Sequence, residues 1–514
     1  MVPLLENLTV RARDGIILAA AALSQSIYLI VARLQTGRFA FPLDDGWVFQ
    51  AYARNLAQRG EWAFIPGVPS TGSTSTLWTP LVAPGYVLPI DPTAWTYLLG
   101  FLSLAAAALG AARLFNEDQV PLSLAVGCAV AVEWHLVWAA ASGMERALFT
   151  ALAIWFWAWL RRNHPAQADF HPVNGLALGL WGGLLALARP EGLLLLAVAG
   201  LFGLLQPGPL LKRGIWGAAA GVGMVIGLLP FLGLNLSISG ELWPNTFFAK
   251  QTEYSVLWQQ PYPLRFVQQI GVSLVGAHVL LIPALIAALV RQIRQRPLDV
   301  LYFLPLIWVV LHWAVYAARL PVVYQHGRYA IPTIPLIVIY GVRGAAELVR
   351  LRSRSQLVRA ASVGYIAAVL VAFPAVTVFL GAPAYAADVH FIEEDIADAA
   401  RWIAAERSDA TIVAAHDIGA LGYYAPGPLL DLAGLVSPEV VPFMLDGERL
   451  AEYVVSEGAD YLMVFPQWNA ACETLVEDER FCPVWTSADE DGTSPAAERL
   501  GPKTIYRVEP GGCP

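Results

Sequence analysis

The sequence predicts a polytopic α-helical membrane protein that ends in an α/β domain outside the cytoplasm. Hydrophobic residues make up 57% of the 514 residues and charged residues only 14%, whereas soluble domains carry about a quarter charged residues. The stretches 15–32 and 361–384 contain no charged residue, and each is long enough to cross the roughly 30 Å hydrocarbon core as a helix. The chain must therefore place much of its surface in lipid.

Charge is divided unevenly along the chain. From Tyr385 to the end, 24 Asp and Glu residues stand against 7 Lys and Arg residues, whereas the preceding part carries a net charge of +9. This division predicts a basic membrane body, residues 1–384, and an acidic C-terminal domain, residues 385–514. An acidic domain argues against a nucleic-acid partner.

The membrane body is expected to contain about eleven spanning helices. The first follows Arg11 and Arg13, and we interpret it as a retained signal anchor because no small-residue cleavage site follows it. The segments at 147–160 and 174–188 are short for a span, which needs about 20 residues. The predicted spans lie near residues 15–35, 93–115, 120–141, 147–160, 174–188, 191–207, 214–236, 267–290, 299–318, 330–349 and 357–380.

The positive charges indicate the orientation of these spans. With the N-terminus in the cytoplasm, 15 of the 25 Lys and Arg residues before Tyr385 fall on the cytoplasmic side, and every cluster is among them, including Arg350, Arg352 and Arg354. This is the positive-inside pattern of a bacterial cell membrane protein. Eleven spans then place the C-terminal domain outside the cytoplasm.

Two connections on the outer side are too long to be simple turns. They run from about residue 37 to 92 and from about 237 to 265, and both are rich in Trp, Tyr and Phe with interspersed Pro and Gly. Long connections of this kind usually carry function, and aromatic residues favour the membrane interface. We expect the functional residues on this side.

The C-terminal domain alternates between helical and strand patterns. Residues 393–406 and 448–457 have helical spacing, whereas 411–415, 461–465 and 504–508 are expected to be strands. This order predicts a compact α/β domain.

The four cysteines indicate no metal site. Cys128 lies in an apolar helix, and no Cys or His spacing resembles a zinc site. Cys472 and Cys482 are close enough in sequence to pair in an oxidising compartment, and Cys513 follows near the end of the chain.

Two adjacent acids, Asp44 and Asp45, lie just beyond the first predicted span. In one interpretation Asp45 caps the following helix and Asp44 is an ordinary loop acid. In the other, one acid is a general base, and its neighbour orients it or helps to hold a cation. The two interpretations do not exclude each other, because a cap would also fix where the acids point.

Further polar residues fall on the same outer side, and each has a structural alternative. The hydroxyl-rich stretch 69–78 suits sugar binding but is also a common loop composition. Glu145 could stabilise a helix N-terminus, and Arg189 could simply pair with Glu191. Lys250 and Arg328 could bind a lipid phosphate or anchor the chain at the interface. His416, at the end of a predicted strand, could bind an acceptor or belong to a turn.

Taken together, these segments resemble the bacterial GT-C-type membrane glycosyltransferases, particularly those similar to mycobacterial arabinofuranosyltransferases and to protein mannosyltransferases. One departure is Gly46-Trp47, where relatives often show a small residue and then Tyr. No single motif is specific, but the ordered set is. It consists of Asp44-Asp45 with Tyr52–Leu56, then Ser75–Trp78, Ser142–Glu145, Ala188–Gly192, Pro244–Phe247, Arg328-Tyr329, Gly419–Tyr424 and Asp431–Leu435.

The resemblance implies transfer of a sugar from a polyprenyl phosphate to an acceptor hydroxyl of a glycan, lipid or protein outside the membrane. Asp44 is the leading general base and Asp45 its partner, and a single carboxylate base implies inversion. The expected phosphate-binding residues are Lys250, Arg328, His326 and Arg189. The expected sugar-binding residues are Ser75, Trp78, Glu145, Asn245 and His416.

A divalent cation such as Mg²⁺, Mn²⁺ or Ca²⁺ would be held by Asp44 and Asp45, because hard cations favour carboxylate and phosphate oxygens. Two other functions compete with transfer. A flippase for lipid-linked sugars should carry polar residues inside its spans, where Glu133 and His135 are exceptions to a pattern nearly free of acids. A non-catalytic envelope assembly protein should have short outer loops, which this chain lacks.

Overall fold

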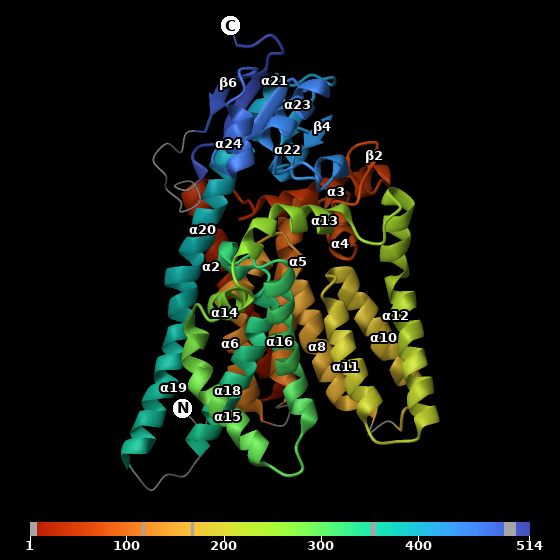
Figure 1. The fold of residues 1–514 in the computed structure, drawn as a ribbon. Helices are drawn as coiled ribbons and strands as arrows, with labels where there is room; N and C mark the ends of the chain where they lie inside the picture. The colour runs from red at the N-terminus through yellow and green to blue at the C-terminus, as the bar shows by residue number, and fades with distance from the viewer. Residues whose placement is uncertain (1–7, 116–118, 166–168, 351–355, 488–499, 514) are drawn as a thin grey trace.

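The protein is a helical bundle with a sheet domain on one end (Figure 1). A computed structural model describes residues 8–115, 119–165, 169–350, 356–487 and 500–513. Arg352 and Arg354, two of the cations expected in the cytoplasm, lie outside the described residues.

Each of the eleven segments predicted to cross the membrane coincides with helical structure. The helices of the bundle are α2 (Val10–Thr36), α5 (Pro92–Leu114), α6 (Val120–Ala131), α7 (Trp134–Ala141), α8 (Arg146–Asn163), α10 (Pro172–Ala188), α11 (Gly192–Leu205), α12 (Leu210–Ser239), α14 (Tyr262–Val272), α15 (Ile282–Arg294), α16 (Val300–Arg319), α18 (Ile334–Arg350) and α19 (Gln356–Val376).

These helices confirm a multi-pass membrane protein. In the described ranges, seven helices are long and apolar enough to cross a membrane, and an eighth span results if the bent pair α6 and α7 is counted as one. The apolar helices α10 and α11 are shorter. The number of crossings therefore stays a prediction.

Close helix packing in the bundle depends on glycine. A Cβ atom at Gly179 of α10 would lie 2.0 Å from the Ala220 carbonyl oxygen of α12, and one at Gly183 would lie 2.5 Å from Gly227. Small residues let membrane helices approach at backbone distance, where dispersion contacts replace the hydrophobic effect. The shortness of α10 therefore does not prevent it from packing tightly along α12.

Two helical segments of the bundle are broken. Helix α6 meets α7 at an angle of 55°. Helix α14 is followed by residues 273–276 and by the short 3₁₀ helix η3 (Ala277–Leu281), which leads into α15. Breaks at membrane depth need side chains or other partners for the freed backbone groups.

The two long outer connections fold into a layer between the bundle and the sheet domain (Figure 1). The first contains α3 (Asp44–Arg59), α4 (Trp78–Val82) and the short paired strands β1 (Ala63–Ile65) and β2 (Val68–Pro69). The second contains α13 (Asn245–Glu253). This layer carries most of the polar residues considered below.

The C-terminal domain continues from the last membrane helix without a loop. Helix α19 runs through a π-helical turn into α20 (Ala382–Phe391), and a second π-helical turn leads to α21 (Asp398–Glu406). The predicted domain boundary after residue 384 falls within this helical stretch.

A five-stranded sheet forms the centre of the domain, in the order β4-β3-β5-β7-β6. Strands β3, β4 and β5 are parallel, and β7 pairs antiparallel with both β5 and β6. The three strands expected from sequence are present, whereas β4, β6 and the helices α22 and α24 were not expected. The bounds are β3 (Val413–Ala415), α22 (Gly419–Tyr424), β4 (Leu429–Asp431), α23 (Gly447–Ser456), β5 (Tyr461–Val464), α24 (Ala470–Val476), β6 (Phe481–Thr486) and β7 (Thr504–Val508).

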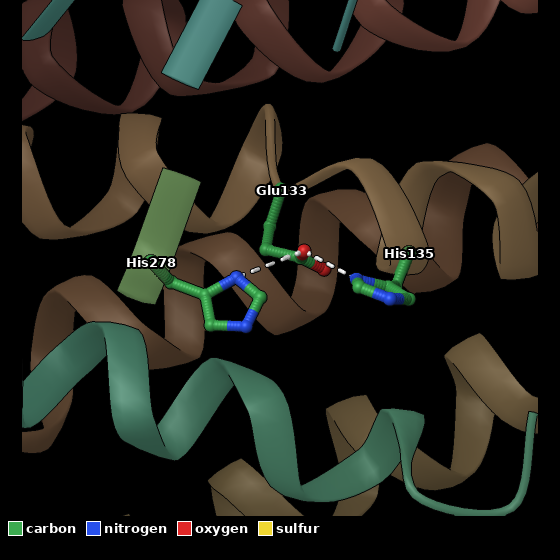
Figure 2. A group of neighbouring side chains, drawn as sticks. All are labelled: Glu133, His135 and His278. Atoms are coloured by element: carbon green, nitrogen blue, oxygen red, sulfur yellow. Dashed lines mark hydrogen bonds and ion pairs between the residues drawn. The ribbon is translucent and has the colours of Figure 1, made fainter. Parts of the chain in front are cut away.

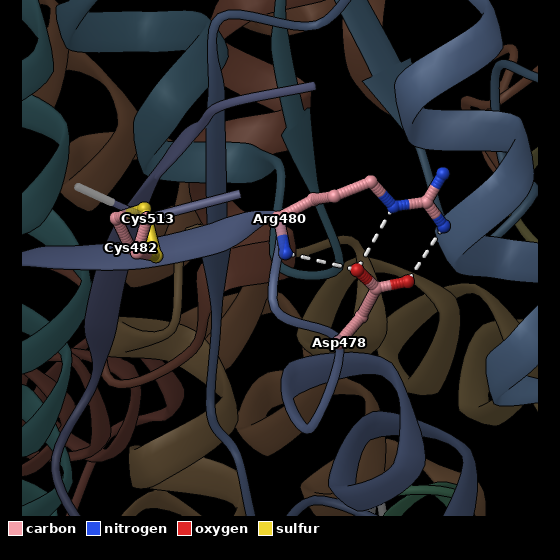
Figure 3. Close-up of a disulfide and its surroundings, with 4 residues drawn as sticks. All are labelled: Asp478, Arg480, Cys482 and Cys513. Carbon is pink, nitrogen blue, oxygen red and sulfur yellow. Dashed lines mark hydrogen bonds and ion pairs between the residues drawn. A yellow bond between two sulfur atoms is a disulfide. The ribbon is translucent and has the colours of Figure 1, made fainter. Parts of the chain in front are cut away.

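The disulfide differs from the expected one. Cys482 of β6 bonds to Cys513 (Figure 3). Cys472 is a free, buried thiol near the start of α24. The pairing of Cys472 with Cys482 was therefore wrong, because closeness in sequence did not reflect where β6 and the chain end meet. On the turn before β6, Arg480 forms an ion pair with Asp478 at 2.6 Å.

Candidate active site

Asp44 and Asp45 occupy the first turn of α3. The N-cap residue of α3 is Leu43, and no side chain caps the helix, so the interpretation of Asp45 as a cap is wrong. Two acids at this end still interact favourably with the positive pole of the helix dipole. A Cβ atom at Gly46 would lie 2.9 Å from the Ser142 carbonyl oxygen, which explains why a small residue follows the acids.

Asp44 connects α3 to the C-terminal domain. Its two carboxylate oxygens accept hydrogen bonds from the backbone N–H groups of Gly419 and Ala420, both at 2.7 Å. Desolvation and the nearby negative charge of Asp417 raise the pKa of Asp44 to about 7, although the two N–H groups act in the opposite direction. Asp44 is thus a carboxylate with both oxygens already occupied.

Asp45 faces cations instead of backbone groups. It forms an ion pair with Arg328 and lies 3.4 Å from the Nζ atom of Lys250. Desolvation alone would raise the pKa of Asp45, but the positive charges of Lys250 and Arg328 hold it well below its usual range. The two adjacent acids therefore have opposite protonation behaviour.

A small cavity of about 100 Å³ lies between α3, α13 and the C-terminal domain. Asp44, Asp45, Lys250, Arg328, Glu253, His416, Asp417 and Trp468 line it. The Nε2 atom of His416 is 3.7 Å from a Glu253 carboxylate oxygen. The buried Lys503 forms an ion pair with Asp417 at 2.6 Å.

The electrostatics of this cavity are set by its acids. Burial would lower the pKa of His416, but the negative charges of Asp417 and Glu253 raise it. Desolvation raises the pKa of Glu253. Desolvation would also raise the pKa of Asp417, but the positive charges of Lys503 and His416 lower it below its usual range. The cavity can thus accept a polar, hydroxyl-bearing molecule, because it offers both donors and acceptors.

A larger cavity of about 340 Å³ opens on the bundle side of α3. Three arginines, Arg146, Arg189 and Arg319, line it together with Trp243, Phe247, Tyr316 and Tyr329. In the described part of the chain, neither Arg146 nor Arg319 forms a salt bridge: Arg146 donates to the Arg328 carbonyl oxygen at 2.8 Å, and Arg319 lies over the Phe247 ring. Positive charge beside aromatic and aliphatic side chains suits a phosphate that carries an apolar tail.

Asp45 lies where the two cavities meet. Asp45, Lys250 and Leu435 line both cavities, whereas Asp44 lines only the small one. A group at Asp45 can therefore contact molecules bound on either side of it.

The structure brings only some of the expected phosphate ligands together. Lys250 and Arg189 line the large cavity, and Arg328 lines the small one. Arg189 is buried between Glu145 and Glu191 and pairs with both. His326 lines neither cavity, and its Nε2 atom is 2.7 Å from an Asp388 oxygen.

The expected sugar-binding residues are similarly divided. His416 lines the small cavity. Ser75 and Trp78 line neither: the Ser75 hydroxyl accepts from the Trp78 N–H at 3.0 Å, and the Trp78 indole donates to the Gly143 carbonyl oxygen. Glu145 is buried against Arg189, and the Asn245 N–H at the start of α13 donates to the Thr71 hydroxyl.

Sequence reasoning missed several residues of the site. Arg146, Arg319, Glu253 and Lys503 were not singled out, although each lies within or next to a segment that was. The carboxylate of Glu253 follows Lys250 by one helical turn on α13, and this spacing could have indicated a shared face.

Asp44 and Asp45 do not fit a hard divalent cation in this arrangement. All four of their carboxylate oxygens already face N–H groups of the protein. Mg²⁺ and Ca²⁺ need several free oxygen ligands, and Lys250 and Arg328 would repel them. A different group of side chains, Glu133, His135 and His278, is arranged so that it could hold a divalent ion.

Comparisons with solved structures place the chain in the GT-C fold. ArnT from Cupriavidus metallidurans is similar over 97% of this chain and 99% of its own in the apo state, with 15% identity and a TM-score of 0.55. Its structure bound to undecaprenyl phosphate gives a TM-score of 0.59 at 15% identity, over 96% and 98% of the two chains. A third similar structure is archaeal oligosaccharyltransferase AglB from Archaeoglobus fulgidus, in complex with an inhibitory peptide and a dolichol-phosphate. Its TM-score is 0.59 at 12% identity, and the match covers 97% of this chain and 75% of AglB.

At this level of identity, the likeness shows the fold alone. It confirms the expected GT-C-type membrane architecture. In sequence, a family described as "Domain of unknown function (DUF8728)" matches residues 384–500. No curated protein sequence matches the chain.

Proposed function

We propose that this GT-C-fold protein is a glycosyltransferase that moves a sugar from a polyprenyl phosphate to an acceptor hydroxyl on the outer face of a bacterial cell membrane. The observation that carries this proposal is the position of Asp45, an ionised carboxylate at the junction of two chemically different cavities. A transferase needs such a group between its donor and its acceptor.

The large cavity is the proposed donor site. Lys250, Arg146 and Arg319 supply positive charge for the phosphate, and the aromatic side chains suit the sugar and the first part of the lipid. Arg189 contributes less charge than the sequence suggests, because Glu145 and Glu191 neutralise it. A neighbouring GT-C structure, ArnT, contains undecaprenyl phosphate, which supports this class of donor.

The small cavity is the proposed acceptor site. It is lined by residues of the outer layer and of the C-terminal domain. His416, Asp417 and Glu253 offer hydrogen-bond partners for hydroxyl groups of a glycan, a glycolipid or a protein.

In the proposed reaction, the acceptor oxygen attacks the anomeric carbon as the bond from that carbon to the phosphate oxygen breaks. The hydroxyl proton goes to the carboxylate of Asp45, and the polyprenyl phosphate leaves with the bond's electrons beside Lys250. The hydroxyl becomes acidic only late in this process, so a carboxylate of low pKa suffices as the base. Attack from the face opposite the phosphate inverts the anomeric centre.

This proposal exchanges the roles first expected for the two acids. Asp44 was the leading base, but it lines only the small cavity, whereas Asp45 lines both cavities. Asp44 is the proposed positioning residue that docks the C-terminal domain on α3. No step uses a metal ion at this pair.

The proposed orientation places the N-terminus in the cytoplasm and the C-terminal domain outside. The Cys482–Cys513 disulfide supports this assignment, because disulfides persist in oxidising compartments. The acidic sheet domain then faces the acceptor side.

The decisive experiment uses purified full-length protein in lipid nanodiscs. A panel of polyprenyl-phosphoryl arabinofuranose, mannose, glucose and galactose is tested with envelope-derived acceptors, and released polyprenyl phosphate is measured. We expect release with one sugar. Asp45→Asn should slow it by about 10²–10⁴-fold, the usual contribution of a general base. Asp44→Asn should slow it less.

The exposed Asp409→Asn is the matched control, with unchanged turnover expected. Full activity of Asp45→Asn would refute its role as the base. In sealed proteoliposomes, a lipid-linked sugar that crosses the bilayer intact, without release of polyprenyl phosphate, would instead identify a flippase.

A further inference from the structure

Three buried side chains converge at the two helix breaks of the bundle. Glu133 is the N-cap residue of α7, His135 lies in its first turn, and His278 belongs to η3. Figure 2 shows the Glu133 carboxylate between the two imidazole rings. All three are at most 1% exposed. Neither cavity of the proposed active site includes them.

The hydrogen bond of His278 fixes its tautomer. Its Nε2 atom lies 2.7 Å from the Ser273 carbonyl oxygen, which can only accept, so Nε2 carries the proton. In the neutral ring, Nδ1 then presents a lone pair. That lone pair faces a Glu133 carboxylate oxygen at 3.6 Å, and Nδ1 has no hydrogen-bond partner in the described protein.

The arrangement is unfavourable without a positive species between the groups. The same Glu133 oxygen lies 2.9 Å from Nδ1 of His135, and Nε2 of His135 is also buried without a partner. The Glu133 oxygen and the facing lone pair of His278 repel each other, and a buried polar atom without a partner is costly. One atom of each residue lies within 4.8 Å of the other two, which is close enough for all three to bind one ion.

We propose that Glu133, His135 and His278 bind a divalent cation of the zinc type inside the membrane bundle. Two imidazole nitrogens and one carboxylate oxygen suit Zn²⁺ and similar borderline metals, whereas Mg²⁺ and Ca²⁺ favour oxygen alone. The surroundings are those of a metal site. The Ser273 carbonyl orients His278, and the Leu136 N–H donates at 2.9 Å to the second Glu133 oxygen.

The ion would join segments far apart in sequence. The Trp134 indole already donates to the Val275 carbonyl oxygen at 2.9 Å, and a Cβ atom at Gly276, whose φ is +130°, would lie 2.5 Å from that indole nitrogen. This close approach brings η3 against the start of α7. The ion would then link the break between α6 and α7 to the break between α14 and η3.

The contact between η3 and the start of α7 also lies close to residues that position Asp45. The ring of Trp134 packs 5.3 Å from that of His326, centroid to centroid, and His326 lies two residues before Arg328. Arg328 in turn holds Asp45. We therefore assign the metal a structural role beneath the site and no contact with substrate.

Metal content of the purified, full-length protein tests the proposal independently of any activity. The protein is loaded with ZnCl₂, passed through a metal-free column and analysed by mass spectrometry. We expect about one tightly held zinc ion per chain. His278→Ala and Glu133→Gln should lose it, and excess MgCl₂ should not displace it. His312→Gln, which removes another buried membrane imidazole, is the matched control and should keep it.

Two measurements on the unaltered protein avoid the problem that a variant may not fold. Loading with CoCl₂ should give the visible absorption of cobalt bound by nitrogen and oxygen ligands in low coordination. Stripping with a chelator should lower the thermal midpoint, and zinc should restore it. The proposal is overturned if the unaltered protein retains no zinc, or if His278→Ala retains as much as the unaltered protein does.

Discussion

Asp44 and Asp45 are neighbours in the chain, yet their surroundings move their pKa values in opposite directions. Desolvation and Asp417 raise the pKa of Asp44 to about 7, while Lys250 and Arg328 keep that of Asp45 low. Environments that push two carboxyl pKa values apart usually give the two groups different roles. Asp45 is therefore the acid that is ionised at neutral pH and can accept a proton, whereas the protonation of Asp44 changes near neutral pH.

The raised pKa of Asp44 predicts that stability falls as pH rises. The folded protein holds this proton more tightly than the unfolded chain, whose Asp has a pKa of 3.8. The resulting stabilisation is fully present below the unfolded pKa and is lost as pH rises through about 7, by at most about 1.4 kcal/mol per pH unit. The test compares the thermal midpoints of the unaltered protein and Asp44→Asn from about pH 5 to pH 8. Relative to the variant, the midpoint of the unaltered protein should fall as pH rises to about 7 and then stay level.

Asn cannot ionise, so the decline with pH should be flatter in this variant. Asp45, Asp417, Glu253 and His416 also face this cavity and titrate in both proteins, so only the difference between the two curves reports on Asp44. Parallel curves would contradict the assignment.

Sequence alone could identify residues of this site only where they stand in polar segments outside the spans. Asp44, Asp45, Lys250 and Arg328 were found in that way. The partners of Asp44 were not, because the backbone N–H groups of Gly419 and Ala420 come from a domain more than 370 residues away. His278 and Glu133 are likewise distant in sequence, so no ligand spacing reveals them.

At the scale of elements, the strained turn before α18 positions Arg328. Gln325 and His326 both have a positive φ, of 52° and 56°, which is unusual for residues other than glycine. Such backbone strain persists only where contacts enforce it. Here Asp388 of α20 accepts hydrogen bonds from His326 at 2.7 Å and from the Trp138 indole at 2.9 Å.

Removing this acceptor should impair the reaction through Arg328. Asp388→Ala frees the turn, so Arg328 should hold Asp45 less firmly and the pKa of Asp45 should rise. We expect turnover to fall several-fold, and most strongly at low pH. The acidic limb of the pH–rate profile should therefore shift to higher pH. Asp388→Asn keeps an oxygen acceptor and should restore much of the activity. Equal loss in both variants at every pH would indicate a merely structural role.

Element types were easier to predict than their interruptions. Hydrophobic length identified eleven segments that are helical in the described structure, because lipid demands apolar segments with internally satisfied backbone. The 55° bend between α6 and α7 and the interruption before η3 were not foreseen, since they depend on contacts such as that of Trp134 with Val275. In the C-terminal domain, the three-residue strand β4 is too short to show a pattern.

At the scale of the whole molecule, two parts of the chain border the proposed active site. The bundle and the outer layer form the large cavity, and the C-terminal domain closes the small one. In the proposed reaction, the acidic sheet domain borders the acceptor site and the membrane body borders the donor site.

This arrangement predicts that substitutions on the two sides affect different substrates. Arg319 lines only the large cavity and His416 only the small one. Arg319→Ala should raise the KM for the lipid-linked donor about tenfold, the loss of one charge-assisted contact, and leave the KM for the acceptor unchanged. His416→Ala should do the reverse, and each variant is the control for the other. The measurement is initial rate as a function of each substrate with the other held at saturation. If either variant changed both KM values equally, the two cavities could not be separate donor and acceptor sites, because binding on one side of Asp45 would then depend on the side chains of the other.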